Sequence, residues 1–140
     1  MAFKVLHYIN QFFAGIGGED KADHGPEVRE GIVGPGLQLK KLLGDEGVIV
    51  ATFICRDNYF ATHTEEVLAL FAKTLKEHTP DLVLAGPSFY AGRYGFACGH
   101  VINEARKVLG IPGIAGMNVE SPAVEMFRND MFIVQTGDSV

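Results

Sequence analysis

The sequence predicts a three-layer α/β domain with a mostly parallel, doubly wound sheet of about five strands. Short apolar segments rich in β-branched residues alternate along the chain with longer segments whose apolar residues recur at helical spacing. Glycine and proline residues mark the ends of the longer segments. Right-handed crossovers leave few topologies for this order of elements, so we expect a flavodoxin-like or Rossmann-like sheet.

The composition is that of a single globular domain. The chain has 140 residues, of which 47% are hydrophobic and 21% are charged. Its formal net charge of −5 argues against a nucleic-acid surface and against a polybasic membrane patch. The N-terminus lacks the pattern of a signal peptide, no apolar run is long enough for a membrane span, and two cysteines cannot form a disulfide framework. We therefore expect one domain over residues 1–140, located in the cytoplasm.

Five short apolar segments are predicted strands. They span residues 3–9, 47–54, 81–85, 113–117 and 131–136. The segment 47–54 is apolar on both faces, as expected of a central parallel strand. The polar segment 11–31 has two interpretations, a solvated loop or a functional flap that faces a partner.

Four segments are predicted helices. They span about residues 36–43, 63–78, 94–109 and 122–128. Thr62 and Glu65 form a capping-box pattern at the start of the second, and Gly110 is expected to end the third in a left-handed conformation. Ser121 is the expected N-cap of the last. A doubly wound domain usually packs a further helix after its last strand, so we expect the chain to be a fragment or to need a partner on that face.

Residues that follow the predicted strands supply the candidate binding site, because ligands of such sheets lie beyond the carboxyl ends of the strands. These residues are Asn10 and Gln11 after the first strand, Cys55, Arg56 and Asp57 after the second, Gly86, Pro87 and Ser88 after the third, and Asn118 and Glu120 after the fourth. Each position is polar or glycine-rich, as expected of a crevice.

The segment 86–99 leaves a strand and enters a helix, and it carries the most information about binding. Its glycines let the backbone approach a ligand, and the free amides at a helix start favour an anion. Arg93 adds a forked donor for a carboxylate or phosphate, and Tyr94 can orient a small substrate. The alternative is a tight turn whose glycines serve packing and whose arginine pairs with a surface carboxylate.

Two cysteines are possible functional thiols. Cys98 lies near a helix start but on the apolar stripe of that helix, which favours a buried, inert thiol. Cys55 lies at a strand end beside Arg56, which would lower its pKa, although a structural role is again the commoner one.

Other familiar sites are not predicted. The sequence has no Walker A pattern, no nucleophile elbow, and no third glycine at the right offset from Gly15 and Gly17 for a dinucleotide fingerprint. The histidines show no metal-ligand spacing, and segment 17–20 lacks the alternation of a calcium loop, so no metal site is expected.

Seven strings of residues, in register along essentially the whole chain, carry a family resemblance. They are segments 7–19, 26–31, 34–36, 85–89, 91–95, 97–99 and 116–120. Together they resemble the selenoprotein subunit of component B of glycine, sarcosine and betaine reductases. A related subunit of D-proline reductase is a weaker match.

The resemblance implies a complex that reductively cleaves the C–N bond of glycine or its N-methylated analogues. In that family a pyruvoyl-bearing subunit of component B holds a primary amine substrate as a Schiff base, and a selenol displaces the amine from the α-carbon. The carbon fragment passes to a selenoprotein carrier and then to a component that releases acetyl phosphate. These components and the small amino-acid substrate are the implied partners, in an oligomeric assembly.

One departure limits what the resemblance implies. The family polypeptide is considerably longer, and its selenocysteine lies beyond these residues. The resemblance therefore implies an N-terminal domain that holds no cofactor of its own and is inactive alone, and Cys98 does not replace the selenocysteine. A non-catalytic assembly domain and a free-standing flavodoxin-like binding protein remain alternatives, and the sequence does not distinguish glycine, sarcosine and betaine as substrates.

Overall fold

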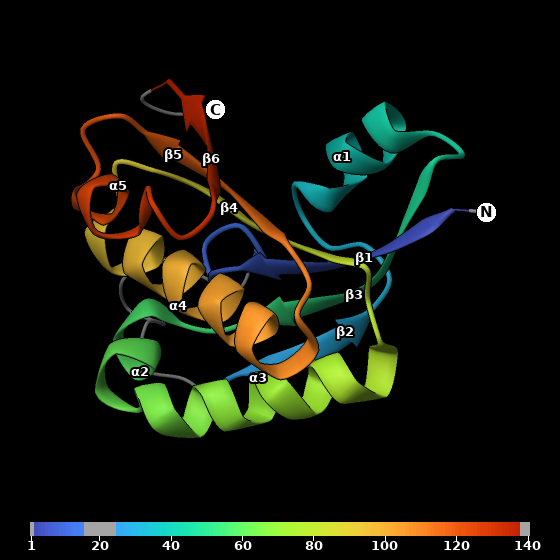
Figure 1. Ribbon diagram of the computed structural model, residues 1–140, viewed down its shortest axis with the longest axis horizontal. Helices are drawn as coiled ribbons and strands as arrows, with labels where there is room; N and C mark the ends of the chain where they lie inside the picture. Colours follow the sequence, from blue (N-terminus) through green and yellow to red (C-terminus); the bar gives the residue numbers. More distant parts are fainter. Residues whose placement is uncertain (1, 16–24, 138–140) are drawn as a thin grey trace.

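The apolar, β-branched segments of the sequence form five parallel strands. They are β1 (Phe3–Ile9), β3 (Gly47–Ile54), β4 (Leu82–Phe89), β5 (Gly113–Asn118) and β6 (Phe132–Thr136). The computed structural model describes residues 2–15 and 25–137, and in it these strands lie in the order β3-β1-β4-β5-β6 (Figure 1). This is the order of flavodoxin-like sheets, so the predicted fold class is confirmed.

A sixth strand, β2 (Glu27–Glu30), pairs antiparallel with β3 and forms one edge of the sheet. The sequence analysis missed it because three of its four residues are charged and a strand exposed on both faces leaves no apolar alternation. It occupies part of the segment 11–31. Residues 16–24, which include the segment considered as a cation loop, lie outside the described residues.

The predicted helices form with small shifts at their ends. They are α1 (Gly36–Leu43), α3 (Thr64–His78), α4 (Gly92–Leu109) and α5 (Pro122–Phe127), with an additional short helix α2 (Asp57–Thr62). Gly110 ends α4 with a φ of 67°, and the Ser121 hydroxyl accepts a hydrogen bond from the Ala123 amide, both as predicted.

The predicted capping box is wrong. Thr62 belongs to α2, and its hydroxyl donates to the Asn58 carbonyl instead of receiving an amide of α3. The pattern misled because a second helix ends directly before α3, and a threonine in a last helical turn can bond to a carbonyl of its own helix.

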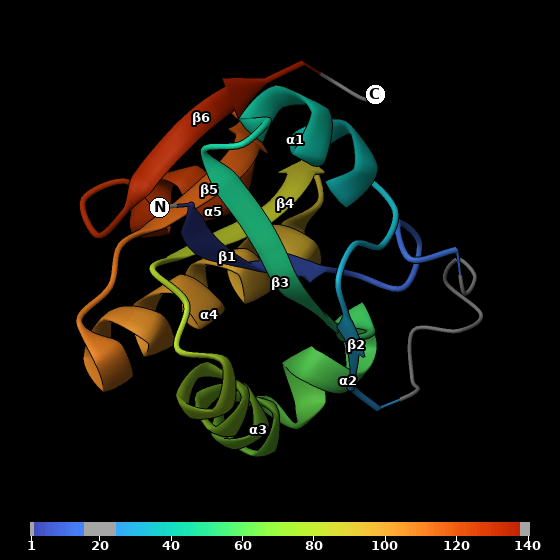
Figure 2. The same ribbon diagram turned by 90° about the vertical axis from the view of Figure 1, so that its right-hand side faces the viewer.

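The two faces of the sheet are covered unequally. Helices α3, α4 and α5 pack on one face, where side chains such as Leu6, Phe53 and Val83 are buried in one cluster. On the other face α1 lies against β3, and Figure 2 shows the sheet between α3 below and α1 above. Helix α1 buries only Gly36, so this second face is only partly covered.

Candidate functional site

A crevice of about 490 Å³ lies at the carboxyl ends of β1 and β4. These strands are neighbours in the sheet, and the chain continues from β1 toward β3 on one side and from β4 toward β5 on the other. This is the topological switch point at which doubly wound sheets bind their ligands. The crevice is lined by Asn10, Gln11, Phe12, Phe13, Asp57, Ser88, Phe89, Tyr90, Ala91 and Tyr94.

The polar floor of the crevice is a small network centred on Asp57, which is 8% exposed. The Asn10 side-chain amide donates to Asp57 Oδ2 at 3.0 Å, and the Asp57 amide donates to Gln11 Oε1 at 3.2 Å. The Asn10 Oδ1 atom also accepts from the Phe13 amide at 3.2 Å. The network joins the ends of β1 and β3, and it holds the carboxylate of Asp57 at the crevice.

Aromatic rings form the walls. The Phe13 ring lies 6.0 Å from the Phe89 ring and 6.0 Å from the Tyr94 ring, and it contacts the Phe12 ring edge-on at 5.2 Å. Phe89 has a φ of 51°, a left-handed conformation that costs a non-glycine residue about 1–2 kcal/mol. The crevice therefore combines one buried carboxylate with several aromatic faces.

Helix α4 begins at the rim of the crevice. Its N-cap residue is Ala91, whose side chain has no group that can bond the first-turn amides. Gly95 lets the helix pack closely in this place, because a Cβ atom there would come within 2.9 Å of the Ala123 side chain of α5. The positive end of an 18-residue helix thus faces the crevice.

Burial keeps the thiols and phenols beneath the crevice protonated. Desolvation, assisted by the charge of Asp57, raises the pKa of Cys55 to about 12, and desolvation raises the pKa of Cys98 well above its ordinary value. Desolvation by burial also raises the pKa values of Tyr8 and Tyr94. Arg56 does lower the pKa of Cys55, as expected, but burial and the charge of Asp57 outweigh it. Both thiols are buried, and their role stays a prediction.

The structure brings together three of the residues that were predicted for the site. Asn10, Ser88 and Tyr94 line the crevice. Gly86 and Ser88 were expected after a strand, but both lie within β4, where the pairing with β5 shifts register between Ala85 and Phe89. Gly86 lines a neighbouring apolar groove instead.

The other predicted site residues lie outside this crevice. Asn118 and Glu120 lie at the end of β5, where the Asn118 amide donates to the carbonyls of Thr136 and Gly137 and its oxygen accepts from the Glu120 amide. Arg93 lines a smaller pocket beside Phe60 and His100. Anion binding by Arg93 stays a prediction, and it concerns a place other than the crevice.

Sequence reasoning placed Gln11 and Asp57 at strand ends that were expected to form the crevice, but it gave neither a specific role. Phe12 and Phe13 were not expected in the lining, because the turn that brings their rings to the end of β4 cannot be read from periodicity. Among the described residues, no group of histidine, cysteine and carboxylate side chains is arranged to hold a metal ion, and no helix is long and apolar enough to span a membrane.

Comparison with known proteins identifies relatives over the whole chain. A model of the family described as glycine/sarcosine/betaine reductase selenoprotein B matches residues 2–140. The sarcosine reductase complex component B subunit beta of Peptoclostridium acidaminophilum is 50% identical over 136 residues, which cover 97% of this chain and 31% of that protein. The glycine reductase complex component B subunit gamma of Symbiobacterium thermophilum is 52% identical over 136 residues, 97% of this chain and 32% of that protein.

A relative named for a third substrate is also similar. The betaine reductase complex component B subunit beta of P. acidaminophilum is 41% identical over 137 residues, 97% of this chain and 31% of that protein. The chain therefore spans 31–32% of the length of these curated relatives. No solved structure matches the chain.

Proposed function

The chain belongs to the glycine/sarcosine/betaine reductase selenoprotein B family, and we propose that it forms the part of a component B subunit that holds the small amino-acid substrate. The observation that carries the proposal is the position of Asp57 and its aromatic neighbours at the topological switch point of the sheet. The reaction of the whole subunit would be the reductive cleavage of the C–N bond of glycine, sarcosine or betaine.

The crevice suits the nitrogen end of such a substrate. Glycine, sarcosine and betaine share a positive nitrogen and differ in the number of its methyl groups. A buried carboxylate attracts this charge, and aromatic faces attract ammonium and quaternary ammonium groups through their negative quadrupole. Asp57 supplies the first of these, and Phe13, Phe89 and Tyr94 supply the second.

The carboxylate end of the same substrate suits the start of α4. The amides of a first helical turn point at a bound anion, and the helix dipole favours negative charge there. Ala91 lies on the rim of the crevice and leaves this helix end without a side-chain cap. A zwitterion would thus lie with its nitrogen toward Asp57 and its carboxylate toward α4, an arrangement that does not require Arg93.

The reactive groups of the reductase would come from elsewhere in the complex. A selenol that attacks the α-carbon and a pyruvoyl group that binds a primary amine supply the chemistry in the family that this chain resembles. The described residues offer no substitute, because the pKa values of Cys55 and Cys98 are raised by burial. The contribution proposed for this chain is to bind and orient the substrate.

Calorimetric titration of the chain with glycine, sarcosine and betaine tests the proposal, with acetate as the ligand that lacks the nitrogen. Asp57→Asn keeps the acceptor for Asn10 but removes the charge, so we expect at least about a tenfold loss of affinity, or roughly 1.4 kcal/mol. Asp130→Asn removes an exposed carboxylate far from the crevice and should leave binding unchanged. Equal binding of the zwitterions to both variants, or of acetate and betaine to the unmodified chain, would contradict the proposal.

A further inference from the structure

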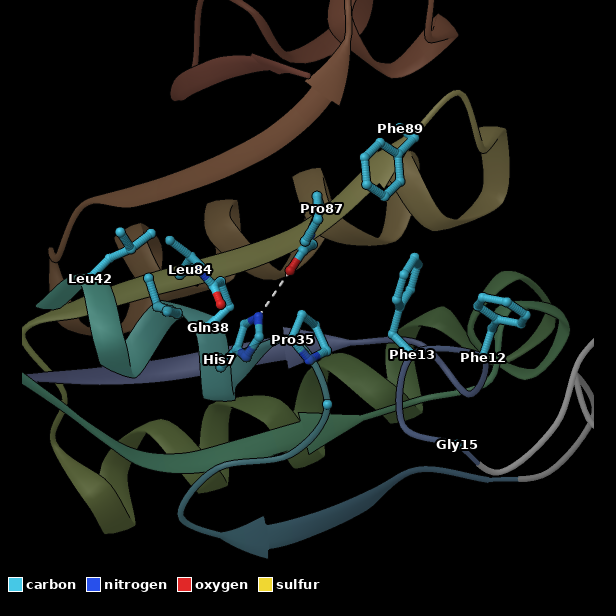
Figure 3. Close-up of a pocket in the computed structure, with 13 residues that line it drawn as sticks. His7, Phe12, Phe13, Gly15, Pro35, Gln38, Leu42, Leu84, Pro87 and Phe89 are labelled. Atoms are coloured by element: carbon cyan, nitrogen blue, oxygen red, sulfur yellow. Dashed lines mark hydrogen bonds between the residues drawn. The ribbon is translucent and has the colours of Figure 1, made fainter. Parts of the chain in front are cut away.

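An apolar groove of about 580 Å³ lies between α1 and β4, on the partly covered face of the sheet. Figure 3 shows Leu42 and Leu84 at one end, Phe12 and Phe13 at the other, and His7 between them. His7 Nε2 donates to the Gly86 carbonyl at 2.9 Å, and burial lowers the pKa of His7, so the one ionisable side chain among the lining residues is neutral. The groove thus presents almost only apolar surface.

Apolar side chains around the groove are left open to solvent. Leu42 on α1 is 77% exposed and Phe132 on β6 is 70% exposed. Ile133 packs against the opposite core, so alternation along β6 places Phe132 and Val134 on the same face of the sheet as the groove. A run of exposed apolar surface across a helix and a sheet face indicates an interaction site.

The comparisons indicate what covers this surface. The matched relatives are about three times as long as the matched region, which is 31–32% of their length. In Figures 1 and 2, β6 ends on the side of the molecule that carries α1, the helix that borders the groove. An apolar helix face of the unmatched polypeptide would supply the layer that a doubly wound sheet needs here.

We infer that the groove is the docking site for the part of the family polypeptide that lies outside this chain. The docked segment inserts apolar side chains between Leu42 of α1 and Leu84 of β4. Phe12, Phe13 and Phe89 line both the groove and the substrate crevice, so the docked segment also contacts the back of the crevice wall. The inference rests on the groove and on the lengths of the relatives, and it holds whether or not the crevice binds a substrate.

The test joins this chain, after residue 140, to the unmatched part of the S. thermophilum subunit through a cleavable protease site. We expect the two pieces to remain together after cleavage, as a one-to-one complex in size-exclusion chromatography with light scattering. Leu42→Asp should separate them or weaken their association at least tenfold. The matched control is Met126→Asp on α5, which is 57% exposed and lies on the opposite face, and it should leave the complex intact.

Three outcomes would overturn the inference. The unmodified pieces could separate on cleavage, or Leu42→Asp could bind as well as Met126→Asp. The chain alone could also form a dimer that Leu42→Asp, but not Met126→Asp, dissociates, in which case a second copy occupies the groove. Hydrogen exchange gives a second measurement, since amides of residues 36–43 should exchange more slowly in the complex than in the chain alone, and unchanged exchange would also count against docking.

Discussion

The two faces of the sheet are formed by the same strands but are packed to different degrees. On one face, Phe71 of α3 and Val101 of α4 are fully buried, and the face is a continuous core. On the other, Leu42 of α1 and Phe132 of β6 remain largely exposed, and α1 buries only Gly36. The contrast separates two kinds of apolar residue, those that stabilise this domain and those whose burial requires something else.

Truncation of a core phenylalanine should have the largest effect. Phe71→Ala leaves a cavity among tightly packed side chains, so we expect the free energy of unfolding to fall by about 3–5 kcal/mol. The same change at Phe132, on the partly covered face, should alter it by less than about 0.5 kcal/mol. Urea denaturation of both variants measures the difference, and similar losses would show that the second face is packed in solution.

Overpacking the first face should have the next largest effect. A Cβ atom at Gly99 would lie within 2.3 Å of the Phe127 ring, because α4 passes close to α5 at this point. Gly99→Ala should therefore cost about 1–3 kcal/mol of stability, even though alanine has the higher helix propensity. Thermal unfolding of Gly99→Ala can be compared with that of Gly44→Ala, where no atom lies within 4 Å of the added Cβ but φ is 56°. The first variant reports the cost of crowding, and the second reports the cost of the backbone conformation.

A smaller effect should appear in the pH dependence of stability. Burial lowers the pKa of His7 in the folded chain, so below about pH 6.5 the unfolded chain takes up a proton that the folded chain does not. Stability should fall as the pH drops through this window, by at most about 1.4 kcal/mol per pH unit for this group.

His7→Gln can still donate to the Gly86 carbonyl, so it isolates the contribution of the proton. The variant should show a flatter stability curve between pH 7 and pH 5 in chemical denaturation. His100→Gln, on the other face, should flatten the curve less, because His100 is only partly buried and its ring keeps more of its hydration than that of His7. Identical stability curves for His7→Gln and the unmodified chain would contradict the assignment of this pH dependence to His7.

The parallel strands and the main helices were predictable because burial imposes patterns that the sequence displays. A buried parallel strand is a run of β-branched residues, as in β3, and a helix end needs residues such as Gly110 or Ser121. The edge strand β2 and the short helix α2 were not predictable in this way, since neither buries a periodic apolar face.

The position of the crevice was more predictable than its lining. The rule that ligands lie beyond the carboxyl ends of parallel strands placed Asn10 at the crevice, and Ser88 also lines it although it lies within β4 and not after it. It could not show that Arg93 lines a separate pocket, or that Phe12 and Phe13 of the turn after β1 line the crevice with Asp57. Rotation about a helix axis and the path of a loop depend on tertiary contacts, and a single sequence does not display these.

The wall formed by Phe12, Phe13 and Phe89 has a thermodynamic consequence. Because these three residues line both the crevice and the groove, an occupant of one cavity that shifts the rings would also reshape the other. If an occupant of the groove changes the affinity of the crevice for its ligand by some factor, that ligand changes the affinity of the groove for its occupant by the same factor. Under such coupling, the binding constant of a crevice ligand depends on whether the groove is empty or filled.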